Sequence, residues 1–115
     1  MARWMPGSVG ALDGGLRGES MSADREVTVR LEGELDMASA SDLDAVLQRA
    51  TARRPRTIVL DLSQLGFVDS SGLAMLASWQ IRARSGDVRF VLRGVQEGVG
   101  RVLDVSGMRA MFTTE

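Results

Sequence analysis

The chain has 115 residues, of which 14 are basic and 15 acidic, so its formal net charge is −1. It contains no cysteine and no histidine, which excludes disulfides and thiolate sites and removes the commonest metal ligand and the commonest general base. A zinc site and a Ser-His-Asp triad are therefore not expected. The length suggests one domain, and the near-neutral charge gives no strong field for direct binding to nucleic acid or to an anionic membrane. No apolar run approaches the roughly 18 residues that a membrane span needs. We expect a soluble, cytoplasmic protein with no cofactor and no metal.

The first 24 residues show no periodic pattern, because glycines and a proline interrupt them: Pro6, Gly7, Gly10, Gly14, Gly15 and Gly18. Two interpretations stay open. Segment 1–24 is either a flexible glycine-rich leader, with Met21 as a candidate translation start, or it contains a weak edge strand around 16–22. In both cases the folded domain is expected at 25–115.

A regular pattern begins at Glu26. Val27, Val29 and Leu31 alternate with polar residues, which predicts a half-buried strand, and Gly33-Glu34-Leu35-Asp36 closes it. A helix is predicted next, with Ser39 and Asp42 resembling a capping box. Its apolar stripe has helical spacing and consists of Leu43, Val46, Leu47 and Ala50. Pro55 ends this helix.

The second half of the chain repeats the alternation of strand and helix. Segment 57–62 is nearly continuous in apolar residues, which predicts a strand covered on both faces. A second helix starts at Asp69-Ser70-Ser71-Gly72 and ends near 85–86. Its expected buried stripe is Leu73, Leu76, Ala77 and Ile81. A strand at 88–92, a third helix around 95–103 and a short strand at 108–113 follow.

This order of elements predicts an α/β fold with right-handed crossovers and a largely parallel sheet. Binding sites in such folds form at the carboxyl ends of the strands. Asp36 and Asp69 each follow a predicted strand, so we expect them on one acidic surface that contacts a partner. Two other interpretations are independent helix caps and a carboxylate pair for acid–base catalysis. No histidine, metal cluster or phosphate-binding glycine loop supports the catalytic one.

The start of the second helix is a candidate site for a phosphate. The first N–H groups of a helix have no intrahelical partner, so they can be capped by Asp69 or a serine, or can bind an anion. On the helical wheel Met75 and Trp79 lie about opposite the expected stripe, which predicts that they face outward and contact a partner. The alternative is that they pack under a neighbouring helix.

Three motifs in this order resemble the STAS domain of bacterial anti-sigma factor antagonists, also called anti-anti-sigma factors. They are Gly33-Glu34-Leu35-Asp36, Phe67-Val68-Asp69-Ser70-Ser71-Gly72-Leu73 and Val102-Leu103-Asp104-Val105-Ser106-Gly107-Met108. The resemblance covers about 25–113 and implies a single-domain STAS fold, with a mostly parallel mixed sheet of four to five strands and three or more helices. The first family strand is barely visible, and the chain stops soon after the last one. The expected state is either a monomer or a weak homodimer, the latter through an exposed sheet edge.

In that family the serine directly after the motif aspartate is phosphorylated by the partner, a kinase-type anti-sigma factor. The resemblance makes Ser70 this residue. It implies that the unphosphorylated domain binds the anti-sigma factor and so releases a sigma factor, and that a PP2C-type phosphatase restores this state. It implies a phosphoprotein without catalytic residues, not an enzyme.

The resemblance and the residue pattern together give a set of expected contacts. Ser71 is expected to be a structural hydrogen-bonding residue rather than a second acceptor. Gly72 allows either the close approach of a partner backbone or a tight turn. The expected partner-binding residues are Asp36, Asp69, Ser71, Gly72, Met75 and Trp79. Two rival functions are a STAS subunit of a stress-sensing or transporter assembly and a small acid–base enzyme that uses Asp36 and Asp69.

Overall fold

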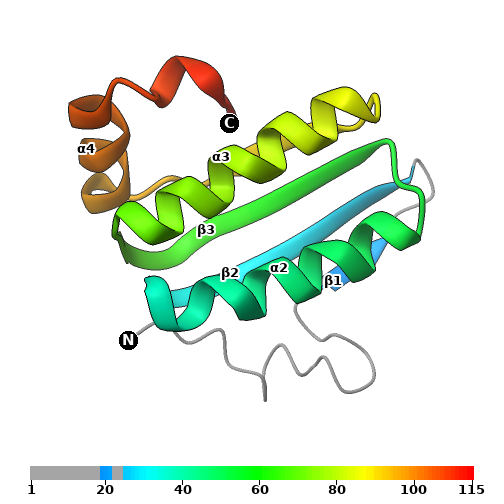
Figure 1. The fold of residues 1–115 in the computed structure, drawn as a ribbon, viewed down its shortest axis with the longest axis horizontal. Helices are drawn as coiled ribbons and strands as arrows, with labels where there is room; N and C mark the ends of the chain where they lie inside the picture. Colours follow the sequence, from blue (N-terminus) through cyan, green and yellow to red (C-terminus); the bar gives the residue numbers. More distant parts are fainter. Residues whose placement is uncertain (1–18, 22–24) are drawn as a thin grey trace.

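The computed structural model describes residues 19–21 and 25–115, which form one five-stranded sheet with its helices (Figure 1). Along the chain the elements are β1 (Glu19–Met21), β2 (Glu26–Leu35), α2 (Met37–Ala52), β3 (Thr57–Val68), α3 (Ser70–Ser85), β4 (Arg89–Arg93), α4 (Glu97–Ser106), the 3-10 helix η1 (Arg109–Met111) and β5 (Thr113–Thr114). The strands lie in the order β1-β2-β3-β4-β5. Only β1 is antiparallel to its neighbour among these strands. This confirms the predicted α/β fold with a mostly parallel mixed sheet.

The strand β1 lies within 16–22, the range in which a weak edge strand was one of the two interpretations of the sequence. Its residue Glu19 pairs with Val29 of β2, and Met21 pairs with Val27. Residues 1–18 and 22–24, on which the prediction of a flexible leader rests, lie outside the described residues. None of the helices in the described ranges is long and apolar enough to cross a lipid bilayer.

The strand β3 is twice as long as the sequence pattern suggested. Ile58, Val59 and Leu60 are all buried, as predicted for a strand covered on both faces. The strand then continues to Val68, although polar residues and a glycine interrupt the apolar run after Leu62. The pairing with β2 survives there through register shifts on either side of Gly33. As a result, β2 and β3 end level with each other, at Leu35 and Val68.

The helix α2 begins one turn earlier than its predicted capping box. Asp36 is the N-cap, and its Oδ1 accepts a hydrogen bond from the Ser39 backbone N–H (3.1 Å). The Ser39 hydroxyl in turn accepts one from the Asp36 N–H (3.0 Å). The prediction that Ser39 and Asp42 form the box is therefore wrong, because Ser39 serves as the third helical residue and not as the cap. The predicted apolar stripe of α2 is confirmed, since all four of its residues are buried.

The helix α3 buries a face that differs from the predicted one. Trp79 is only 4% exposed, whereas Ile81, expected in the buried stripe, is 58% exposed. The buried residues are Gly72, Leu73, Leu76, Trp79, Gln80 and Ala83, which turns the buried face by about a quarter turn. The prediction that Trp79 faces outward is therefore wrong, and Met75 is half-buried against the core. Trp79 follows the alternative in which it packs under a neighbouring helix.

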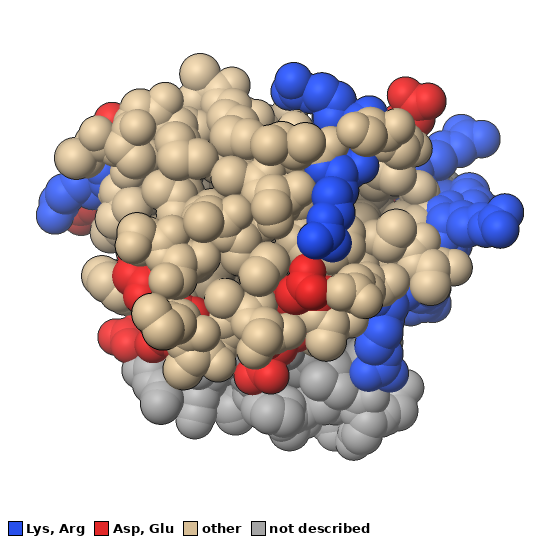
Figure 2. All heavy atoms as spheres, viewed as in Figure 1, with Lys and Arg blue, Asp and Glu red and all other residues tan. Residues whose placement is uncertain are grey.

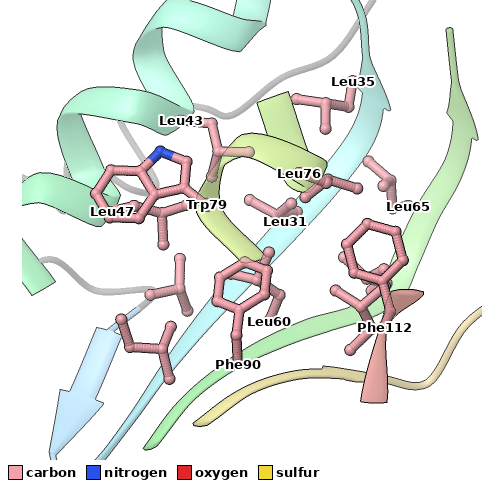
Figure 3. Packing of buried hydrophobic residues seen from close by; sticks show 14 of the residues in the cluster. Leu31, Leu35, Leu43, Leu47, Leu60, Leu65, Leu76, Trp79, Phe90 and Phe112 are labelled. Carbon is pink, nitrogen blue, oxygen red and sulfur yellow. The ribbon is translucent and has the colours of Figure 1, made fainter. Parts of the chain in front are cut away.

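Contact with α2 explains this rotation. The helices α2 and α3 run side by side over one face of the sheet (Figure 1). The Trp79 indole lies inside the hydrophobic cluster with its nitrogen towards α2 (Figure 3). It donates a hydrogen bond to the Asp44 carboxylate of α2 (2.9 Å). The helix α3 is covered by α2 as well as by the sheet. Its buried face therefore includes the side with Trp79, which the helical wheel had placed towards solvent.

The C-terminal part of the chain places α4 at the carboxyl ends of the strands. A Cβ atom on Gly98, in the first turn of α4, would lie 2.8 Å from the carbonyl oxygen of Gly66 in β3, so the two backbones are in close contact. The strand predicted at 108–113 is wrong in extent, because Arg109–Met111 forms η1 and β5 covers only Thr113–Thr114. Phe112 between them is buried and anchors this segment to the core.

Candidate functional site

The ends of β2 and β3 bring Asp36 and Asp69 together. Leu35 and Val68 are register partners, and each aspartate is the next residue in its strand. The backbone N–H of Asp69 also donates a hydrogen bond to the carbonyl of Leu35 (3.0 Å). Both aspartates are half-buried. The two side chains therefore sit at the same end of the sheet, each at the start of a helix.

Each of these carboxylates caps the helix that follows it. Asp69 Oδ1 accepts a hydrogen bond from the N–H of Gly72 (2.9 Å), and Asp36 Oδ1 accepts from Ala38 (3.0 Å) and Ser39. An aspartate cap stabilises a helix by about 1 kcal/mol relative to alanine. This arrangement favours the interpretation as two helix caps over an acid–base pair, because the carboxylate oxygens are engaged by backbone donors.

Ser70 is the first residue of α3 and its side chain is exposed, whereas Ser71 is half-buried. The first backbone N–H groups of a helix lack intrahelical acceptors, and the helix dipole places partial positive charge there. An anionic group on the Ser70 oxygen would therefore lie in solvent at the positive end of α3. Of the two serines, Ser70 is the more exposed.

Gly72 allows the start of α3 to pack tightly against β2. A Cβ atom on this buried residue would lie 2.6 Å from the Leu35 carbonyl oxygen and 2.8 Å from both Leu35 Cγ and Val68 Cγ2. The close approach at Gly72 is thus to the chain's own strand end. This favours the tight-turn alternative over contact with a partner backbone.

A shallow apolar hollow of about 380 Å³ lies beside Ser70, between α3 and α4. Its lining residues are Ser70, Leu73, Arg101, Val102, Val105 and Ser106. Val105 is 84% exposed. The sequence analysis did not identify Arg101 or Val105 as site residues. A signal was present for Val105, because it is an apolar residue that departs from the buried stripe of Val99 and Leu103.

Arg101 is the charged residue among those that line this hollow. Arg101 is exposed and forms an ion pair with Glu97 one turn away (3.2 Å). Arg109 is held more firmly, since it donates to both the Asp104 carboxylate and the Gly100 carbonyl. The hydrogen bond from Arg109 lowers the pKa of Asp104, and the same bond raises the pKa of Arg109. Arg101 is therefore the cation that is available to a group on Ser70.

Comparison with known proteins identifies the family. Residues 20–113 match the family model described as Mlab, STAS domain. The chain is 25% identical over 94 residues to the anti-sigma-B factor antagonist of Staphylococcus aureus (strain NCTC 8325), which covers 82% of this chain and 87% of the relative. Among solved structures, it resembles the anti-sigma factor antagonist SpoIIAA in its unphosphorylated form, with a TM-score of 0.70, 24% identity, and coverage of 84% of this chain and 85% of the other. The phosphorylated form of the Bacillus SpoIIAA gives a TM-score of 0.64 at 23% identity over 84% and 88% of the two chains.

Proposed function

Because the chain belongs to the STAS domain family, we propose that it is a cytoplasmic anti-sigma factor antagonist, a regulator that acts through protein binding and not as an enzyme. In this proposal the unphosphorylated protein binds a kinase-type anti-sigma factor and so releases a sigma factor. The kinase phosphorylates Ser70, which ends the binding, and a PP2C-type phosphatase reverses the modification. The observation that carries the proposal is the exposed serine at the start of α3, directly after its cap Asp69.

The modification is a phosphoryl transfer for which this chain supplies only the acceptor. The Ser70 oxygen attacks the γ-phosphorus of ATP, the bond from that phosphorus to the β–γ bridging oxygen breaks, and ADP leaves. The hydroxyl proton passes to a base on the kinase. The carboxylate of Asp69 is engaged by the N–H of Gly72 and serves here to fix the start of α3.

Phosphorylation at this position is compatible with an unchanged fold. A phosphate adds about −1.5 to −2 charges, and the free N–H groups and dipole at the start of α3 favour an anion there. The half-buried carboxylates of Asp36 and Asp69 remain committed to their caps. The effect of the phosphate is therefore expected at the surface that a partner covers, and not in the core.

The hollow beside Ser70 supports a mechanism for the switch. Leu73, Val102 and Val105 give it an apolar lining, which suits an apolar side chain of the anti-sigma factor. A partner seated there would exclude water from the Ser70 side chain. Excluding water from a neutral hydroxyl costs little free energy. A phosphate loses much of its hydration there, and this loss weakens binding unless matching charges on the partner offset it. Phosphorylation then weakens binding by desolvation and by repulsion from acidic partner groups.

The proposal is tested by incubating the protein with ATP and each kinase-type anti-sigma factor encoded in the same genome. Mass spectrometry of the tryptic peptide 57–82 should find one phosphate, on Ser70. The matched variants are Ser70→Ala, which should remain unmodified, and Ser71→Ala, which should be phosphorylated like the wild type. Phosphate on Ser71 in the Ser70→Ala variant, or no phosphate with any of these kinases, would overturn the proposal. Binding should be lost in the phosphorylated protein and retained in Ser70→Ala.

A further inference from the structure

A second cavity, of about 470 Å³, lies at the opposite end of α3 from Ser70. It is enclosed by the C-terminal ends of α2 and α3 and by the starts of β3 and β4, and its walls include Pro55, Ile58, Trp79 and Val88. The distance along α3 from Ser70 to this cavity is roughly 20 Å, at 1.5 Å per residue. Its volume falls within the range of small-molecule sites, which are mostly apolar with a few polar groups. The partner surface proposed above does not include it.

Arg54 provides the first polar group at this cavity. It follows the C-cap Arg53 of α2 and has a φ of 55°, a left-handed conformation that glycine usually supplies at this position. Its carbonyl oxygen accepts a hydrogen bond from the Arg25 guanidinium. Its own guanidinium is exposed and pairs with no carboxylate of the described residues. A cation that pairs with no carboxylate of residues 19–21 and 25–115 is thus held at an apolar cavity, on a backbone conformation that costs free energy.

Arg82 provides the second polar group. Its guanidinium lies over the Trp79 ring, 4.5 Å from the ring centre. It is 3.6 Å from the Asp44 oxygen that already accepts the Trp79 N–H. This long and exposed ion pair is weak, so Arg82 can turn towards a ligand without a large loss.

Basic residues predominate at the end of the molecule around this cavity, where the exposed Asp87 also lies. Every basic residue of the chain is an arginine, and blue side chains gather at the right-hand end of the view, over the ends of α2 and α3 (Figure 2). The exposed arginines of this end outside the cavity include Arg49, Arg53, Arg56, Arg84 and Arg89. Such a field raises the local concentration of anions.

We propose that this cavity binds a small amphiphilic carboxylate. Its apolar body would fill the space between Pro55, Ile58 and Val88, and its carboxylate would pair with Arg54 and Arg82. The walls disfavour a wholly polar ligand, because they offer it few hydrogen-bond partners. The Arg54 guanidinium, which has no carboxylate partner in the part of the chain that the structure describes, disfavours a wholly apolar ligand and matches the fork geometry of a carboxylate.

The experiment uses decanoate below its micelle concentration as the probe and the Trp4→Phe variant of the full chain. The chain has two tryptophans, so Trp79 is then the only one and reports on the cavity that it lines. We expect a saturable change in Trp79 fluorescence and a rise in melting temperature. Decanol, which has the same apolar body without the charge, should bind more weakly.

Matched variants locate the binding. Arg54→Gln should raise the dissociation constant for decanoate roughly tenfold and leave that for decanol unchanged. Arg84→Gln removes the same charge from the same end, outside the cavity lining, and should leave both within about twofold. Ala83→Leu, which places a larger side chain in the cavity, should abolish binding of both probes. If that variant fails to fold, Arg54→Gln, which changes only an exposed side chain, carries the test.

Three results would overturn the proposal: no saturable fluorescence change, an equal loss of affinity in Arg54→Gln and Arg84→Gln, or binding of an acidic peptide in place of decanoate. Equal losses would indicate adsorption to a generally basic surface. The site is independent of the phosphorylation switch, so Ser70→Ala should bind decanoate like the wild type.

Discussion

Replacing Gly72 with alanine adds one methyl group where α3 meets the ends of β2 and β3. The new Cβ atom would lie 2.6 Å from the Leu35 carbonyl oxygen and 2.8 Å from side-chain atoms of both Leu35 and Val68. All three distances are shorter than ordinary van der Waals contact. The Leu35 carbonyl is already fixed by its hydrogen bond from the Asp69 N–H (3.0 Å), so it cannot move away without breaking that bond.

Two opposing effects set the magnitude of the change. Overpacking a tight core costs about 1–3 kcal/mol, and we take the upper end because one of the contacts is with backbone. Alanine is favoured over glycine inside a helix by about 1 kcal/mol. The expected net result is that Gly72→Ala lowers the free energy of unfolding by about 2 kcal/mol. This corresponds to a factor of about 30 in the equilibrium constant between the folded and unfolded states.

Urea denaturation followed by far-UV circular dichroism measures this change as a lower midpoint at an unchanged m-value. The matched control is Gly66→Ala in β3, where the nearest atom to a new Cβ is the Gly33 carbonyl oxygen at 3.9 Å. This variant has room for the methyl group and should be as stable as the wild type or more so. If Gly72→Ala matched or exceeded the stability of the wild type, the tight contact with Leu35 would not be what positions the start of α3.

Three further predictions concern individual side-chain hydrogen bonds: that of Trp79 to Asp44, the cap made by Asp36, and that of Arg109 to Asp104. Trp79→Phe should lower the free energy of unfolding by about 1–2 kcal/mol in urea, because the indole hydrogen bond to Asp44 is lost; an unchanged midpoint would show that this bond adds nothing. Asp36→Ala should cost about 1 kcal/mol and Asp36→Asn much less, since asparagine also caps helices, and equal losses would contradict the capping role. Arg109→Gln should raise the pKa of the Asp104 carboxyl towards its ordinary value, measured by carbon NMR titration. In the wild type the pair stabilises the fold above that ordinary value, and this contribution is lost as the pH falls through the lowered pKa; the same titration curve in both proteins would refute it.

The order of the elements could be predicted because each strand and helix start leaves a local signal. The stripe from Leu43 to Ala50 is apolar throughout, so its helical period identifies the buried face, although α2 contacts α3 as well as the sheet. The helix α3 is covered by both the sheet and α2, and its buried face includes the polar Gln80 as well as Trp79, which donates to Asp44 of α2. A helical wheel built on apolar residues placed Trp79 on the outer face and left the polar Gln80 out of the buried stripe. The predicted buried face was therefore rotated from the observed one.

The candidate site could be predicted only in part, for a topological reason. Asp36, Asp69 and Ser70 follow strand ends, and parallel strands bring such ends together. Arg101 and Val105 come from a helix that starts more than twenty residues later in the chain. They reach Ser70 because Gly98 packs against Gly66, a contact between two glycines that no periodicity reveals.

The restriction of the surface charges to carboxylates and guanidinium groups has a consequence for the response of the protein to acidity. The chain has no histidine, cysteine or tyrosine, and of these histidine is the side chain whose ordinary charge change falls at physiological pH. The unmodified protein therefore lacks the side-chain type that most often makes a protein respond to modest acidification. A phosphate on Ser70 would introduce a group with a second pKa near 6. Sensitivity to modest acidification would then be a property of the phosphorylated form.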